Sequence, residues 1–142
     1  MSKLGLSYAL DLARDVGAKV IAYHAISIEE EVKAIRANLV HMYDLVRGNR
    51  RLLNEFVTET FKDRMNLVEL LQVVEMGVPF QNIVDRADLE KVDLIVIATH
   101  GRTGVDHMML GSVAEKVVAR ASCPVLVIPR RRRSALAEDA AA

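Results

Sequence analysis

The segment from Ala98 to Ser112 (ATHGRTGVDHMMLGS) holds the residues of this 142-residue chain whose types and spacing best suit ligand chemistry. Gly101 and Gly104 allow backbone conformations that are closed to other residues, and they let the backbone approach a ligand closely. Gly111 and Ser112 open a predicted helix, where free N–H groups and the helix dipole favour an anion and the serine hydroxyl adds a hydrogen bond. Together these groups form a candidate phosphate cradle. The alternative is ordinary turn and cap chemistry.

Other candidate residues favour structural roles. His100 and His107 share this segment with Asp106, but three neighbours in a loop do not fix a metal geometry, so we predict no metal site. His24, near the end of a strand, is interpreted as hydrogen-bonded in the core rather than catalytic. The chain has no Gly-x4-Gly-Lys-Ser/Thr loop, no dinucleotide Gly-x-Gly-x-x-Gly and no Ser/His/Asp elbow. We therefore predict no catalytic residue and no enzyme.

The elements that position the loop alternate between helix and strand. Apolar residues at helical spacing predict helices at Ser2 to Val16, Pro79 to about Lys91 and Ser112 to Ala121, and two helices or one bent helix, broken near Gly48-Asn49, between Ile28 and Lys62. Short apolar runs predict strands at Lys19 to Ile26, Val68 to Met76, Asp93 to Thr99 and Pro124 to Ile128. This order predicts an α/β fold with a parallel sheet. Ligands of such sheets bind outside the carboxyl ends of the strands.

Composition limits the partners and the compartment. Lys plus Arg and Asp plus Glu are equal at 19 each, so no net field attracts nucleic acid or an anionic membrane. The chain has no apolar run of about 18 residues and no signal-peptide pattern, so we expect the cytoplasm. Cys123 is the single cysteine, which fits a reducing compartment and a packing role. The tail, residues 130–142 (RRRRSALAEDAAA), is expected to be a flexible, solvated end after one domain at 1–129.

The runs DLIVIATHGRTG and MMLGSVAEKVVARASCPVLVI resemble the carboxyl half of the universal stress protein family. In that family a Gly-x2-Gly-x9-Gly-Ser/Thr motif wraps the ribose and phosphates of ATP. The second glycine falls on Gly101, the third on Gly111 and the hydroxyl on Ser112, whereas the first glycine is replaced by Ala98. The resemblance implies a three-layer Rossmann-like fold, similar to adenine nucleotide alpha hydrolases, with an open parallel sheet of four strands in this chain.

The same resemblance implies a partial nucleotide site for ATP, with or without magnesium. Its expected parts are contacts to the base, the ribose and the phosphates, and one residue that helps to neutralise charge. The residues concerned are Ala25 and Ile97 at the base, Ala98 and Gly101 near the ribose, Gly111, Ser112 and Val113 at the phosphates, and Arg102 for the charge, with Thr99 and His100 in the same stretch.

One departure from the family concerns the front of the chain. Family members usually begin with a strand and an Asp-bearing loop before the helix that opens here at Ser2. No residue of this sequence supplies them, and a truncated start is the simplest interpretation. The strand at Lys19 to Ile26 is then expected to pair directly with the one at Asp93 to Thr99, to leave a gap, or to accept a strand from elsewhere, because buried edge groups do not stay unpaired.

Three functions follow from the resemblance. The first is a non-catalytic stress-response module that forms a homodimer through its last strand, Pro124 to Ile128, because an apolar edge strand needs cover. The second is an ATP-binding regulatory switch of the same fold. The third, an enzyme acting on the nucleotide, lacks an evident base or metal carboxylate in the Ala98 to Ser112 loop, and we rank it last.

Overall fold

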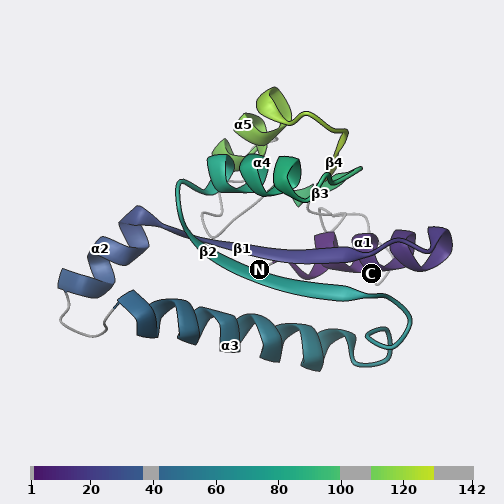
Figure 1. Ribbon diagram of the computed structural model, residues 1–142, viewed down its shortest axis with the longest axis horizontal. Coiled ribbons are helices and arrows are strands. Elements are labelled where there is room, and N and C mark those ends of the chain that lie inside the picture. The colour runs from purple at the N-terminus through teal and green to yellow at the C-terminus, as the bar shows by residue number, and fades with distance from the viewer. Residues whose placement is uncertain (1, 37–41, 100–109, 130–142) are drawn as a thin grey trace, which may run out of the picture.

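The computed structural model describes residues 2–36, 42–99 and 110–129 (Figure 1). In chain order, its elements are α1 (Lys3–Val16), β1 (Val20–Ser27), α2 (Ile28–Arg36), α3 (Met42–Phe61), β2 (Leu70–Gly77), α4 (Pro79–Leu89), β3 (Ile95–Ala98), α5 (Ser112–Arg120) and β4 (Val125–Ile128). All four predicted strands are present, which confirms the prediction that the short apolar runs form strands. The predicted tail at 130–142 lies outside the described residues.

Helix α1 begins and ends at the residues that its sequence indicates. The Ser2 side chain accepts a hydrogen bond of 3.2 Å from the Gly5 amide, as expected of a residue that caps a helix. Gly17 ends the helix in the left-handed conformation, with φ of 69°, and its amide bonds to the Ala13 carbonyl. Leu10 and Ala13 face the core. Helix α4 likewise opens with Pro79 in its first turn, as predicted.

The prediction of a helix break near Gly48-Asn49 is wrong. Gly48 and Asn49 lie inside the continuous helix α3, and the division between α2 and α3 falls at residues 37–41, outside the described part of the chain. A glycine inside a helix costs only about 1 kcal/mol relative to alanine. Burial of Leu53 and Val57 on the same helix outweighs that cost, because each fully buried aliphatic side chain contributes about 1.5–3 kcal/mol.

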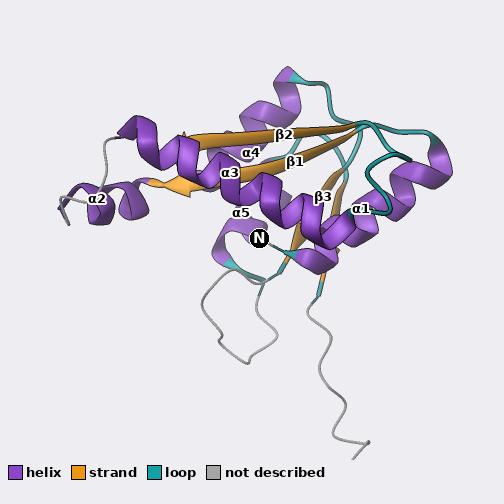
Figure 2. Ribbon diagram, turned by 90° about the horizontal axis from the view of Figure 1, so that it is seen from below, coloured by secondary structure: helices purple, strands orange, loops and turns teal. Residues whose placement is uncertain are grey.

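The four strands form two parallel pairs. β1 pairs with β2 over eight residues, from Val20 opposite Leu70 to Ser27 opposite Gly77. β3 pairs with β4 over four residues, from Ile95 opposite Val125 to Ala98 opposite Ile128. β1 and β3 are not hydrogen-bonded to each other, so of the three arrangements expected for these strands, direct pairing is not the one observed. The pairs start close together and diverge toward their carboxyl ends (Figure 2).

Helices cover both faces of the strands and complete three layers. α1 and α3 lie on one side of the strands, and α4 and α5 lie on the other (Figures 1 and 2). One core cluster joins α1, α3 and the β1–β2 pair through Leu10, Ala13, Val20, Phe61 and Val68. A second, under the same pair, holds Ala22, Ile26, Leu53, Val57 and Val74. The third belongs to the β3–β4 side, where Ala87, Ile95 and Val117 pack together.

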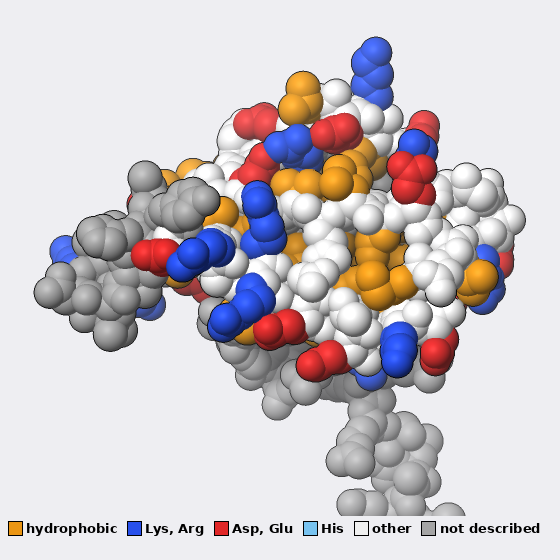
Figure 3. All heavy atoms as spheres, turned by 60° about the horizontal axis from the view of Figure 1, so that its bottom comes forward, with side chains coloured by type: hydrophobic (Ala, Val, Ile, Leu, Met, Phe, Trp, Pro, Cys, Tyr) orange, Lys and Arg blue, Asp and Glu red, His pale blue; other side chains and the backbone are white. Residues whose placement is uncertain are grey.

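The surface carries both charge signs, as the equal numbers of acidic and basic residues predict. On the face drawn in Figure 3, Lys and Arg side chains are interspersed with Asp and Glu. Arg47 pairs with Asp44 at 2.9 Å, and Lys19 pairs with Glu69 at 2.9 Å. All four side chains are largely solvated, so each pair contributes little to stability, about 0–1 kcal/mol. This face offers no one-signed patch for a polyanion.

Candidate functional site

The end of β3 and the start of α5 are joined through their backbones. The Gly111 amide donates a hydrogen bond of 3.0 Å to the Thr99 carbonyl oxygen. A Cβ at residue 111 would lie 2.4 Å from that oxygen, which is too close for any other residue. Gly111 has an ordinary φ of −58°, so glycine is needed here for space and not for its conformational freedom. The close backbone approach predicted for Gly101 and Gly104 lies outside the described residues, whereas Gly111 makes a close approach to the chain's own backbone.

Helix α5 begins immediately after this contact, and no side chain of the described residues caps its amino end. Gly111 is the N-cap residue, and Ser112 is the first residue of the helix. The expectation that the Ser112 hydroxyl caps α5 is therefore wrong. Ser112 is instead exposed beside the backbone amides of the first turn of α5. These amides have no hydrogen-bond partner within the helix. This arrangement suits an anion, although Glu115 in the same turn adds a like charge that opposes one.

The first turn of α1 lies against the same end of β3. A Cβ on Gly5 would lie 3.8 Å from both the amide nitrogen and the Cβ of Ala98 and 3.5 Å from the Ser2 hydroxyl oxygen. These are ordinary contact distances, so the α1 turn is seated directly on Ala98. Sequence reasoning treated Ser2 only as a cap and did not connect Gly5 with Ala98, because Gly5 belongs to no spaced motif.

Seven of the predicted site residues fall in the described part of the chain. Ala98, Thr99, Gly111 and Ser112 are brought together as described above. Ile97 and Val113 both pack against the cluster of Ala87, Ile95 and Val117. Ala25 lies on the other strand pair, opposite Glu75, and the carboxyl ends of the two pairs diverge (Figure 2). His100, Gly101 and Arg102 lie outside the described residues, as do His107 and Asp106.

Comparison with known proteins decides the family. The model of the universal stress protein family matches residues 1–129. The chain belongs to the universal stress protein family. Universal stress protein MJ0531 of Methanocaldococcus jannaschii is 29% identical over 136 residues, covering 89% of this chain and 74% of that protein. Universal stress protein MJ0577 of the same organism is 30% identical over 129 residues, covering 80% and 78%.

Solved structures confirm the α/β fold of this universal stress protein. The structure of protein MJ0577 superposes with a TM-score of 0.69 at 25% identity, covering 89% of this chain and 88% of that one. A universal stress protein in complex with cAMP superposes with a TM-score of 0.58 at 22% identity, covering 92% and 88%. The fold predicted from the alternation of helices and strands is therefore shown.

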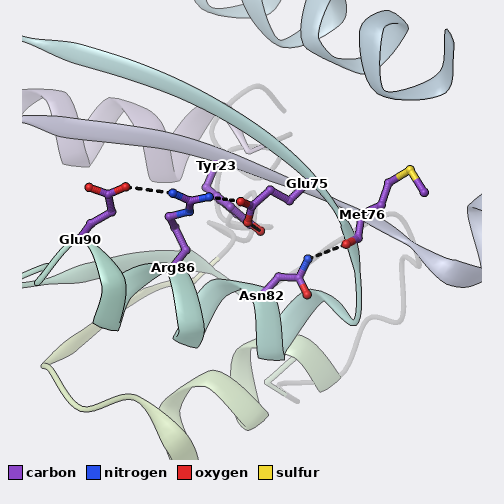
Figure 4. A network of polar contacts seen from close by, with 6 residues as sticks. All are labelled: Tyr23, Glu75, Met76, Asn82, Arg86 and Glu90. Atoms are coloured by element: carbon purple, nitrogen blue, oxygen red, sulfur yellow. Dashed lines mark hydrogen bonds and ion pairs between the residues drawn. The ribbon is translucent and has the colours of Figure 1, made fainter. Parts of the chain in front are cut away.

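The described polar network of this universal stress protein lies away from the α5 amino end, between α4 and the β1–β2 pair (Figure 4). The Tyr23 hydroxyl donates a hydrogen bond of 2.6 Å to Glu75, and Arg86 of α4 pairs with the other oxygen of that carboxylate. Arg86 also pairs with Glu90 at 2.9 Å. Every charged group in the network has a partner, so the network fastens α4 to the strands and leaves no unpaired base for chemistry.

The contacts of this network shift the pKa values of Glu75 and Tyr23. The Arg86 hydrogen bond lowers the pKa of Glu75, against the opposing effect of burial. Burial raises the pKa of Tyr23 well above its usual value, and the hydrogen bond to Glu75 adds to the effect. Sequence reasoning missed this network because its members are far apart in the chain and carry no spacing signal.

The remaining candidates have structural environments. His24 lies 3.2 Å from the Asn49 side-chain oxygen of α3 and is partly buried, in agreement with a hydrogen-bonded role. Cys123 is partly buried against the Ala87, Ile95 and Val117 cluster, which confirms its packing role. Within the described residues, no three His, Cys, Asp or Glu side chains lie close enough to hold a metal ion. No helix among these residues is long and apolar enough to cross a membrane.

Proposed function

We propose that this universal stress protein is a non-catalytic stress-response module that pairs with itself through β4 and carries a partial site for a nucleotide phosphate. We also place it in the cytoplasm, which is supported by its lone cysteine and its balance of charges. The structural observation that carries the partial phosphate site is the Thr99–Gly111 contact, which holds the start of α5 at the carboxyl end of β3.

Several features support a phosphate site that is only partial. The exposed Ser112 hydroxyl and the first-turn amides of α5 are suitable donors, but Glu115 opposes an anion at the same turn. Ala25, the residue expected at the base, lies on the other strand pair. Ile97 and Val113 are engaged in core packing. Donors for a phosphate without an assembled contact to the base favour weak nucleotide binding.

Self-pairing is supported by the chemistry of β4. In its parallel ladder with β3, alternate residues bond to the neighbour, and the backbone groups of Val125 and Val127 are directed to the outer edge. The strand is wholly apolar, and its Leu126 side chain is 39% exposed. An apolar edge whose backbone groups pair with no described strand is a template for another strand. A second copy of β4 across a two-fold axis satisfies both needs at once.

The alternative is an ATP-binding regulatory switch, which is favoured by the exposed Ser112 at a helix start that no described side chain caps. A universal stress protein in complex with cAMP shows that a nucleotide is bound by another protein of this fold. Under this alternative the ligand is ATP, with or without magnesium, and it binds tightly enough to be retained. An ATP-hydrolysing enzyme remains a weaker proposal, because Glu115 is the one carboxylate that the described residues place in the first turn of α5 and no described metal cluster accompanies it.

Calorimetric titration of ATP, with and without magnesium, tests the partial site. The module proposal predicts no saturable binding at micromolar concentrations of a folded protein. The switch alternative predicts micromolar binding that Ser112→Ala abolishes and that Thr58→Ala, which removes an exposed hydroxyl from distant α3, leaves unchanged. Gly111→Ala is a poor probe of binding, because its Cβ would collide with the Thr99 carbonyl and disturb the fold itself.

A further inference from the structure

The edge of β2 that faces away from β1 carries backbone groups with no partner among the described residues. The Val20 amide bonds to the Glu69 carbonyl at 2.8 Å, which fixes the alternation of the parallel ladder. Odd-numbered residues of β2 therefore bond to β1, and the backbone groups of Leu70, Gln72 and Val74 are directed to the outer edge. In the part of the chain that the structure describes, no backbone hydrogen bond reaches these three positions from outside the β1–β2 pair.

The last position of this outer edge is closed by the chain itself. Met76 continues the same alternation, and its carbonyl oxygen accepts a hydrogen bond of 2.9 Å from the Asn82 side chain of α4 (Figure 4). A Cβ on Gly77 would lie 2.6 Å from the Asn82 Oδ1 atom, so the glycine gives Asn82 the space for this bond. The open stretch of the edge therefore ends before Met76 and comprises residues 70–74.

Helix α3 flanks one side of the open stretch with a row of side chains that contains arginine and no carboxylate. The Gln72 side chain donates a hydrogen bond of 3.2 Å to the Asn54 oxygen, so this side of α3 lies along β2. Residues three, four and seven positions apart share a helix face. The α3 row therefore consists of Arg47, Arg50, Asn54 and Thr58, and all four are exposed.

The direction of α3 sets which residue of β2 each member of the α3 row flanks. α3 and β2 run in opposite directions (Figure 1). Four residues of helix rise about 6 Å, which is the length of about two residues of strand. Arg50, four residues before Asn54, therefore lies beside Val74, two residues after Gln72. Arg50 forms no ion pair with another described residue, so its charge is available to a partner.

The other side of the open stretch, toward α4, offers apolar surface. Glu75 pairs with Arg86 of α4, and the two-residue period of a strand places Leu71 on the same side. Leu71 is 51% exposed, and Leu89, one turn beyond Arg86, is 70% exposed. Glu75, Arg86 and Glu90 are paired with one another, so the two leucines are the groups left for an apolar partner.

These two sides specify the chemistry of a strand that pairs with residues 70–74. Neighbouring side chains of a strand point to opposite faces of the sheet. Partner residues opposite Gln72 and Val74 point to the α3 row, where a carboxylate suits Arg50. Partner residues opposite Leu71 and Val73 point toward α4, where an aliphatic side chain covers Leu71. The complementary strand therefore alternates acidic and aliphatic residues.

A second copy of β2 does not complement this edge. Pairing across a two-fold axis at Gln72 places the two α3 helices side by side on one face of the sheet. Each copy then offers the other a row with Arg47 and Arg50 and no carboxylate, so like charges meet. Charged side chains beside an edge strand are a common means of preventing association between copies. The occupant that fits is a segment of different sequence.

We propose that the outer edge of β2, residues 70–74, binds an extended segment of another protein in which acidic residues alternate with aliphatic ones. The backbone of the segment pairs with Leu70, Gln72 and Val74, its acidic side chains lie toward Arg50, and its aliphatic side chains cover Leu71. A length of about five residues matches the open stretch. β4 belongs to the other strand pair, so this surface is separate from the edge proposed for self-pairing.

Residue-resolved hydrogen exchange on the full chain tests the proposal. The probe is a synthetic peptide of about seven residues with blocked ends, in which Glu alternates with Val or Ile. We expect amide exchange at Leu70, Gln72 and Val74 to slow by at least about tenfold when the peptide saturates the protein. The amides of Leu71 and Val73, which already bond to β1, serve as internal controls and should change less.

N-methylation of the peptide separates strand pairing from other modes of binding. Alternate amides of an edge-paired strand bond to the neighbouring strand, and the amides between them face away. Methylation of one alternate set should therefore abolish the protection, and methylation of the other set should leave it. The protein is unchanged in this comparison, so its folding does not affect the result. Equal effects of the two sets overturn the proposal.

Arg50→Glu tests the charge of the α3 row, and Arg51→Glu is its matched control. Arg51 lies on another side of α3 and pairs with Glu55 at 3.5 Å. In calorimetric titration of the same peptide, we expect binding to weaken by at least about tenfold for Arg50→Glu and by less than about twofold for Arg51→Glu. Equal weakening by both variants shows a general electrostatic attraction and overturns the assignment of the α3 row.

Two further outcomes overturn the proposal. The first is no protection at Leu70, Gln72 or Val74 with about 1 mM peptide, or protection confined to β4. The second is equal affinity for a peptide with Lys in place of Glu, because the α3 row then does not select acidic residues.

Discussion

The amide of Gly111 and the carbonyl oxygen of Thr99 lie 3.0 Å apart, and a Cβ at residue 111 would approach that oxygen to 2.4 Å. This contact sets where α5 starts relative to the end of β3. It therefore controls both the stability of the β3–α5 unit and the position of the proposed phosphate donors.

Gly111→Ala is expected to destabilise the protein by about 1–3 kcal/mol, because the new methyl group must displace backbone. Gly48→Ala is the matched control, since nothing lies within 4 Å of its Cβ position inside helix α3. That change is expected to stabilise the protein by about 0.5–1 kcal/mol through helix propensity. Urea unfolding measures both, and equal midpoints for the two variants would contradict the close contact.

Glu75→Gln tests the network that fastens α4 to the strands. Because Arg86 lowers the pKa of Glu75 below its usual 4.5, the ionised carboxylate stabilises the fold at pH above that value. The contribution is lost as the pH falls through the lower pKa of the folded state. We expect Glu75→Gln to cost about 1–2 kcal/mol at pH 7, a range reduced for its partial exposure.

The control for this prediction is Glu69→Gln, which breaks an ion pair with Lys19 whose two side chains are 69% and 75% exposed. It is expected to change stability by less than about 0.5 kcal/mol. Unfolding curves across the acid range should show the Glu75→Gln deficit shrinking toward low pH. A deficit that is the same at every pH would show that packing, and not the ion pair, is responsible.

Tyr23 gives an optical signal from the same network. Burial and the hydrogen bond to Glu75 raise its pKa, so its phenol stays neutral where an ordinary tyrosine ionises. Neutral Tyr23 stabilises the fold below the unfolded pKa of 10.0, and this contribution is lost as the pH rises through the higher folded pKa. In an ultraviolet titration of the three tyrosines, we expect a late step that Tyr23→Phe removes. A titration without that step would contradict the buried contact.

The sequence predicted the fold well where local chemistry determines structure. The runs KVIAYHAI and PVLVI are strands because apolar β-branched residues suit a covered sheet, and Ser2 and Gly17 delimit α1 because caps are local. The break predicted near Gly48 was wrong because tertiary packing of α3 overrides a single glycine. Helix and strand signals are local, so they do not specify whether β1 and β3 pair.

The site was predicted in part for the same reason. Gly111 was recognised from its spacing. The atom that it approaches, the Thr99 oxygen, depends on how the start of α5 is placed against the end of β3, and spacing does not specify that. The seat of Gly5 on Ala98 and the Tyr23–Glu75–Arg86 network join segments that are distant in sequence. A single sequence contains no signal for such pairings unless the residues form a known motif.

Self-pairing through β4 is the central claim, and the molar mass from light scattering tests it most directly. We predict a mass twice that of the 15.8 kDa chain for the native sequence and the mass of a single chain for Leu126→Glu. Leu71→Glu places the same charge on β2, at a side chain that is 51% exposed, and should leave the dimer intact. A single-chain mass for the native protein, or a dimer that survives Leu126→Glu, would contradict the account.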